Sequence, residues 1–169
     1  SWEDDAATAE ATKNLLDAHN IDVLTMHSDS LIPLDIAEER GVMSIGYNWD
    51  NSTNYPETYL TAAVWDWESF YKPIILKCLQ GKFEGKNYWE GIDSGVVDLA
   101  PLTDKVNPET QTVILQEMEK LRSGTYDVFY GPIYDNAGNL RIEEGECMTD
   151  NAMLNEFDWY VEGVMIDEK

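Results

Sequence analysis

Two short apolar stretches near the start of the chain each end in a polar segment. Residues 21–26 (Ile-Asp-Val-Leu-Thr-Met) have the pattern of a strand and lead into His-Ser-Asp-Ser at 27–30. Residues 42–47 (Val-Met-Ser-Ile-Gly-Tyr) have the same character and lead into Asn-Trp-Asp at 48–50. In an open α/β sheet, ligands bind at the carboxyl ends of the strands. The two polar segments therefore predict a site for a small polar ligand.

Each of these strands follows a helical pattern. Residues 4–18 place their apolar side chains on one stripe, and residues 33–40 begin with a proline suited to the first helical turn. Gly41 suits the position just after a helix. A strand–helix–strand unit pairs its strands in parallel with a right-handed crossover by default. We expect an α/β fold with a mostly parallel sheet flanked by helices.

The rest of the chain continues this alternation and changes character after residue 125. Cys78 falls in the apolar run of a predicted helix, so we expect a buried free thiol there. The further elements predicted are a strand at 58–65, a helix at 67–79, short strands at 88–91 and 96–100, a helix at 107–122, a hairpin with strands at 126–134 and 140–142, and a terminal helix starting near 149–151.

The net charge of the chain limits the classes of partner that it can bind. It carries 33 acidic residues against 11 Lys and Arg, a net charge of −22, which repels nucleic acids and anionic membrane surfaces. No apolar run approaches the length of a membrane span. The sequence starts at Ser1 without an initiator methionine, so we expect a mature, trimmed or expressed fragment in which a leader would not be visible.

The polar segment at 27–30 is compatible with several kinds of chemistry. A zinc site would need more ligands than it has, because the chain holds only two His and its two Cys are far apart, so we expect no metal or cofactor. A Ser-His-Asp hydrolase would need a G-x-S-x-G elbow, which is absent. Two interpretations stay open: turn residues that cap the next helix, or a ligand clamp formed by His27, Ser28 and Asp29.

Asp50 and the tryptophans extend this candidate site. The carboxylate of Asp50 could accept hydrogen bonds from vicinal hydroxyls or an exocyclic amine, or it could close an ordinary Asx turn. The chain has six Trp, and several fall near the ends of predicted elements, where a flat indole could stack on a ring. Trp65 and Trp67 would point to opposite faces if the strand continued through both, so at most one should face the site.

Several segments, in order, resemble the basic membrane protein family. These are substrate-binding lipoproteins of ABC transporters, and many of them bind purine nucleosides or nucleobases. The matching segments are T-M-H-S-D-S at 25–30, A-E-E-R-G-V-M-S-I-G-Y at 37–47, N-W-D at 48–50, L-T-A-A-V-W-D-W at 60–67, G-K-F-E-G-K-N-Y-W-E-G-I-D-S-G-V-V-D-L-A-P at 81–101, G-P-I-Y-D-N-A-G-N-L-R at 131–141 and L-N-E-F-D-W-Y-V-E-G-V at 154–164.

The resemblance implies a fold like that of type I periplasmic binding proteins, in which two α/β lobes are hinged around a ligand. Residues 1–169 would form the distal lobe and C-terminal half of such a protein, with partial elements of the second lobe. Residues 126–169 would be a C-terminal hairpin and helix extension. The implied partners are the missing N-terminal lobe and an ABC transporter permease. The implied location is extracytoplasmic, with a lipid anchor or in the periplasm.

The resemblance also implies which residues touch the ligand. Trp2 matches a Trp near the ligand, and Asp50 matches an Asp that contacts sugar hydroxyls in nucleoside binders. Trp65 stands where many members have a Lys, which favours stacking on a bare ring and a free purine such as adenine. The expected ligand contacts are Trp2, His27, Ser28, Asp29, Asp50 and Trp65.

The favoured hypothesis is therefore a non-catalytic protein that captures a purine nucleobase or nucleoside for uptake. One alternative is an enzyme that acts on nucleosides through Asp29 and Asp50. A second alternative is a sensor domain that binds the same ligand without transporting it.

Overall fold

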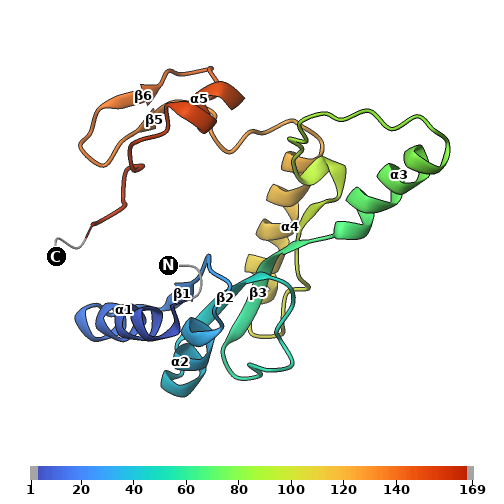
Figure 1. Cartoon of the computed structure of the whole chain (residues 1–169). Coiled ribbons are helices and arrows are strands. Elements are labelled where there is room, and N and C mark those ends of the chain that lie inside the picture. The colour runs from blue at the N-terminus through green and yellow to red at the C-terminus, as the bar shows by residue number, and fades with distance from the viewer. Residues whose placement is uncertain (1–3, 167–169) are drawn as a thin grey trace. The chain divides into compact units, whose positions relative to one another are not determined.

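A four-stranded sheet organises the first part of the chain, in a computed structural model that describes residues 4–166. The strand order is β1 (Val23–Thr25), β2 (Met43–Asn48), β3 (Tyr59–Trp65) and β4 (Val97–Leu99). The first three strands run parallel (Figure 1). β4 pairs antiparallel with β3. The prediction of an α/β fold with a mostly parallel sheet is confirmed.

Two helices precede the first two strands, as the pattern predicted. Asp4 caps α1 (Asp5–Ala18) with its carboxylate, while α2 (Ile32–Arg40) has Pro33 in its first turn. Gly41 ends α2 in the left-handed conformation, with φ of 69°, which glycine adopts without steric cost. α2 packs on β2, and α1 packs on α2.

The core lies between α2, the sheet and the loop after β2. It is built on six buried side chains: Met26, Leu34, Tyr55, Tyr59, Ala62 and Ala100. Tyr59 is fully buried against Gly46, where an added Cβ would come within 2.6 Å of the tyrosine oxygen. That oxygen accepts the backbone N–H of Asn51 at 3.1 Å and donates to the carbonyl of Trp49 at 3.3 Å. The core thus anchors the loop that follows β2.

The next segment leaves the sheet. α3 (Trp67–Leu79) contains no buried residue, and Cys78 is exposed, so the prediction of a buried thiol is wrong. Residues 80–91 form no regular element, and the strand predicted at 88–91 is absent; a short 3-10 turn, η1 (Ile92–Ser94), precedes β4. Within the described residues α3 has few apolar contacts: Phe70 meets the ring of Tyr88, with 4.6 Å between centroids, while most of its other apolar side chains are exposed.

α4 (Pro108–Arg122) follows β4, as predicted, and the chain forms a second compact unit from Glu117 onward. That unit contains β5 (Ile133–Tyr134), β6 (Leu140–Ile142) and α5 (Asp150–Asn155). The first hairpin strand is much shorter than predicted, because 126–132 is held mainly by isolated contacts with 146–148.

The turn of the hairpin is organised around the buried carboxylate of Asp135. It accepts the backbone N–H groups of Ala137 and Asn139 at 2.9 and 2.8 Å and the Arg141 guanidinium at 2.7 Å. The amide and backbone N–H of Asn139, with Arg141, hold the pKa of this carboxyl well below its usual range, although burial opposes them. Arg141 also lies over the Trp159 ring at 5.6 Å, which ties the tail to the hairpin.

Among residues 4–166, no helix combines the length and the apolar composition required to cross a membrane.

Candidate functional site

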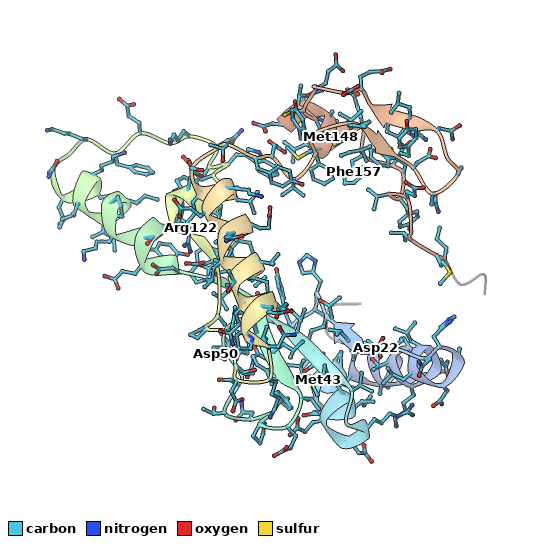
Figure 2. The ribbon with its side chains drawn as sticks, turned by 180° about the vertical axis from the view of Figure 1, so that it is seen from behind. Asp22, Met43, Asp50, Arg122, Met148 and Phe157 are labelled. Atoms are coloured by element: carbon cyan, nitrogen blue, oxygen red, sulfur yellow. The ribbon has the colours of Figure 1, made fainter. Side chains whose placement is uncertain are left out.

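The carboxyl ends of β1, β2 and β3 meet at one edge of the sheet, because the three strands are parallel. β2 starts at Met43, and Asp50 follows its other end, as the labelled side chains in Figure 2 show. Asp22 precedes β1 and so lies at the opposite end of that strand from the segment 27–30. The predicted ligand residues are therefore judged by what they contact at this edge.

Three rings from three strand ends contact one another. The imidazole of His27 meets the ring of Tyr47 edge to face, with 4.3 Å between centroids. Tyr47 in turn meets the indole of Trp65 at 6.3 Å and an interplanar angle of 81°. Tyr47 pairs with Ala63 across the parallel strands, and Trp65 lies two residues further on the same face. His27 is exposed, whereas Tyr47 and Trp65 are half-buried.

A hydrogen-bonded chain runs beside these rings. The side-chain amide of Asn48 donates from Nδ2 to Oδ1 of Asp29 at 2.7 Å. Its own Oδ1 accepts the indole Nε1–H of Trp65 at 3.0 Å. Asn48 has a φ of 73°, and it is the one residue other than glycine with positive φ in the described part of the chain. Together these contacts bring Asp29, His27 and Trp65 into one cluster.

The other predicted site residues are placed differently. Asp50 is exposed, and its carboxylate accepts the N–H of Ser52 at 2.8 Å, which is the turn arrangement that the sequence left open. The hydroxyl of Ser28 lies 3.4 Å from the carbonyl of Ser30. The hydroxyl of Ser30 accepts the backbone N–H of Ile32 at 3.4 Å, at the start of α2. Trp2 lies outside the described residues. The structure thus joins His27, Asp29 and Trp65 and gives Asp50 and Ser28 local turn contacts.

Trp67 extends the aromatic surface beyond the strand. Its ring stacks on Trp65, with centroids 5.8 Å apart and planes 26° from parallel. The expectation that these two indoles face opposite ways is wrong, because residues two apart on a strand share a face. Here β3 ends at Trp65 and Trp67 begins α3, and the two rings still lie together. A hollow of about 460 Å³ opens here. It is lined by Trp65, Trp67, Phe70, Tyr88, Trp89, Glu90, Val96 and Val97.

A further carboxylate sits between the two indoles in sequence. Asp66 caps α3 by accepting the N–H of Glu68 at 3.0 Å and the hydroxyl of Ser69 at 2.7 Å. The Ser69 hydroxyl, with the backbone N–H groups of Glu68 and Ser69, lowers the pKa of Asp66, although desolvation opposes them. Asp66 is therefore ionised at neutral pH and is already occupied by its capping role.

This edge of the sheet is suited to binding without covalent chemistry. It presents an imidazole, a carboxylate and an indole face, and a flat heterocycle with N–H donors matches that set. No group of three or more His, Cys, Asp or Glu that could hold a metal occurs within residues 4–166.

Sequence reasoning missed Tyr47, Asn48 and Trp67. The first two are the last residues of β2, and the parallel register alone would place them beside the end of β3. Asparagine is one of the few residues that adopt left-handed backbone conformations readily, so its position at a strand end was a signal. Trp67 could not be placed, because its position depends on the residue at which the strand stops.

The comparisons with known proteins agree with this architecture. The family model described as ABC transporter substrate-binding protein PnrA-like matches residues 1–129. A purine-binding protein from Brucella abortus is 33% identical over 165 residues, covering 97% of this chain and 46% of its own length. A protein named as an ABC transporter glucose-binding protein, from Haloferax volcanii, is 29% identical, with 97% of this chain and 39% of its own length covered. The chain spans less than half the length of these two relatives.

Two solved structures share the fold. A transcriptional activator of the comK gene from Bacillus halodurans aligns with a TM-score of 0.69 and 22% identity over 76% of this chain and 46% of its own. A solute-binding protein of an ABC transporter system from Conexibacter woesei aligns with a TM-score of 0.58 and 20% identity over 75% of this chain and 43% of its own. At these identities the likeness concerns the fold alone.

The fold is thus the one that the family resemblance implied, and the family model covers most of the chain. Its members are substrate-binding proteins rather than enzymes. The chain belongs to the family of PnrA-like ABC transporter substrate-binding proteins.

Proposed function

We propose that this chain supplies the ligand-gripping lobe of an ABC transporter substrate-binding protein that captures a purine, with a nucleobase such as adenine favoured over a nucleoside. The observation that carries the proposal is the joined cluster of His27, Asp29 and Trp65 at three parallel strand ends. A purine offers a flat ring for the indole and N–H groups for the carboxylate. The name of the relative from Brucella abortus supports the same ligand class.

In this proposal the predicted contacts have distinct tasks. Trp65 stacks on the ring, Asp29 accepts its N–H groups, and His27 and Ser28 supply further polar contacts. Asp50 borders the site and would meet ribose hydroxyls if a nucleoside were bound, and Trp2 is a further proposed contact with the ligand. The ABC permease receives the loaded protein outside the cytoplasm, where a lipid anchor or the periplasm retains it.

The proposal includes an N-terminal lobe that completes the binding cleft. α3 supports this, because its apolar side chains are exposed: Ile75 is 55%, Leu76 51% and Leu79 79% accessible. Scattered exposed apolar residues are normal, but a continuous apolar helix face marks a surface that a partner covers. The length of the relatives supports a partner of similar size to this chain. Residues 126–169 then form a C-terminal extension of hairpin and helix.

Isothermal calorimetry on the full-length protein tests the ligand. We expect clear binding of adenine, weaker binding of guanosine and inosine, and no binding of glucose. Asp29→Ala should weaken adenine binding about tenfold or more, because a charge-assisted hydrogen bond is lost. Asp22→Ala is the matched control, since it removes an exposed carboxylate at the far end of the same strand. Glucose binding without any purine binding would overturn the proposal and favour the ligand class named for the Haloferax volcanii relative.

Thiol labelling tests the second lobe. Cys78 lies on α3 at helical spacing from Tyr71 and Ile75, and both cysteines of the chain are exposed. In this chain alone, Cys78 and Cys147 should react at similar rates with an alkylating reagent. In the full-length protein, Cys78 should be shielded while Cys147 stays reactive. Equal labelling of both cysteines in the full-length protein would contradict the proposal that a second lobe covers α3.

The chain alone should bind adenine weakly, because one lobe supplies only half of the cleft. Sub-micromolar adenine binding by this chain alone would contradict the two-lobed cleft.

A further inference from the structure

We propose that Asn48 is a positioning residue of the site, whose side-chain amide fixes the Trp65 indole and the Asp29 carboxylate in one arrangement toward the ligand. This inference rests on the proposed function, because it concerns the same site. Asn48 was not among the expected ligand contacts. It is half-buried, and its role follows from the two hydrogen bonds and the backbone conformation described above.

The two hydrogen bonds of Asn48 are directional. Its Nδ2 donates to the carboxylate of Asp29, and its Oδ1 accepts from the indole of Trp65. The opposite orientation of the amide would place an acceptor against a carboxylate and a donor against an N–H group, and neither pair can form a hydrogen bond. The neighbours of Asn48 therefore select one amide orientation. The amide in turn holds residues from the ends of β1 and β3 at a fixed spacing.

This arrangement determines what the ligand meets. The indole of Trp65 has one polar hydrogen, and Asn48 already accepts it, so Trp65 can offer the ligand only its ring, on the face that Trp67 does not cover. Asn48 engages one oxygen of Asp29, while the carboxylate as a whole remains exposed and can accept further bonds. Such a site selects a planar ligand with N–H donors on one edge over a ligand that needs a donor from the indole.

The backbone at Asn48 explains why this residue type stands here. With φ of 73°, the position is strained for most side chains and is tolerated by Asn and Gly. Gly would keep the turn of the chain but would lose both hydrogen bonds. Residues held in rare backbone conformations cluster at ligand sites, where the surrounding structure over-determines them. Asn is thus the residue that satisfies both the turn and the amide bridge.

The test compares four variants of the full-length protein. Asn48→Gly keeps the left-handed backbone accessible and removes the amide. Asn48→Asp keeps the acceptor for Trp65 but sets a carboxylate against Asp29. The double variant D29N/N48D restores one amide and one carboxylate in exchanged positions. Asn20→Gly, in the exposed loop between α1 and β1, is the matched control.

Two measurements are made on each variant. The first is hydrogen exchange of the Trp65 indole N–H in the ligand-free protein by NMR, with the signal assigned from Trp65→Phe. The second is adenine affinity by calorimetry. We expect Asn48→Gly to raise the indole exchange rate about tenfold and to weaken adenine binding by about the same factor. Both Asn48→Asp and the double variant should keep the indole protected, because both retain an acceptor for it. The double variant should also recover part of the adenine affinity that Asn48→Asp alone loses.

The outcomes separate this inference from the proposed function. Unchanged indole exchange in Asn48→Gly would overturn the bridge. Faster exchange with adenine binding equal to that of the parent protein would show that Asn48 matters only for structure, and would also overturn the inference. If the parent protein does not bind adenine, the purine proposal fails, and the inference is then decided by the indole exchange rates in the ligand-free protein.

Discussion

Helix α3 has a more apolar sequence than helix α2, yet α2 is the helix whose side chains are buried. α2 buries four of its residues: Pro33, Leu34, Ile36 and Ala37. α3 is longer, with 13 residues against nine, and buries none within the described part of the chain. Both helices begin and end with ordinary signals, such as the Asp66 cap of α3 and the Gly41 end of α2.

The comparison separates helix formation from helix burial. Caps and spacing specify where each helix lies, but the energy of a globular helix comes mostly from packing its apolar face. α2 obtains that energy within this chain, from β2 and the loop after it. α3 obtains little of that energy within the described residues, where Phe70 packs on Tyr88, and we propose that the N-terminal lobe supplies the rest.

The largest expected effect is on the core contact of α2. Leu34 is 1% exposed, and Leu34→Ala should lower the free energy of unfolding by about 2–5 kcal/mol through the lost burial and the cavity left behind. Leu76→Ala, in α3, removes the same atoms from a side chain that is 51% exposed and should change it by less than about 0.5 kcal/mol. Urea unfolding of this chain alone measures both. Equal losses of unfolding free energy in the two variants would contradict the difference in burial between α2 and α3.

A smaller effect is expected at the polar contact that holds α2 to the loop before β3. Glu38 accepts the N–H groups of Glu57 and Thr58, both at 3.0 Å, and the Thr58 hydroxyl at 2.6 Å. Glu38→Gln should cost about 1–2 kcal/mol at neutral pH, because the charge-assisted bonds weaken. Urea unfolding at several pH values measures this difference.

The same residue predicts a pH dependence. Burial raises the pKa of Glu38, but the Thr58 hydroxyl, the two N–H groups and the charge of Lys105 outweigh it and leave the pKa lowered. A carboxylate with a lowered folded-state pKa stabilises the fold above its ordinary value of 4.5, and this stabilisation is lost as the pH falls through the folded value. The parent protein and Glu38→Gln should therefore converge in stability toward pH 3. A difference that stays constant between pH 7 and pH 3 would exclude this electrostatic origin.

The smallest expected effect is at the start of α3. Asp66→Ala removes the acceptor for the N–H of Glu68 and the hydroxyl of Ser69. Amide hydrogen exchange in the first turn of α3 should become faster, with little change in global stability. Protection that remains as in the parent protein would mean that packing, and not the cap, holds this turn.

Local signals predicted most of the fold. The proline and glycine at the ends of α2 gave its bounds to within one residue, and the strand–helix–strand rule gave the parallel pairing of β1 and β2. The predictions that Cys78 is buried and that residues 88–91 form a strand were wrong for the same reason. An apolar pattern predicts that a segment packs against other apolar residues. It does not show whether those residues belong to this chain.

The candidate site was predictable in part. Strand ends in an α/β sheet identify the region, which predicted His27 and Asp29, and the family resemblance added Trp65. The bridge through Asn48 depends on the β2–β3 register and on a left-handed residue, and neither follows from hydrophobic periodicity. Asp50 shows why a strand-end position alone does not identify a ligand contact. A carboxylate there can accept a backbone N–H of its own turn as readily as it can bind a ligand.

The proposed grip on a purine is tested most directly by a crystal structure of the full-length protein with adenine bound. The account predicts the adenine ring stacked on Trp65 at van der Waals distance, about 3.5–4 Å, with an N–H group donating to Asp29. Adenine bound elsewhere, with the indole of Trp65 and the carboxylate of Asp29 both turned away from it, would contradict the account.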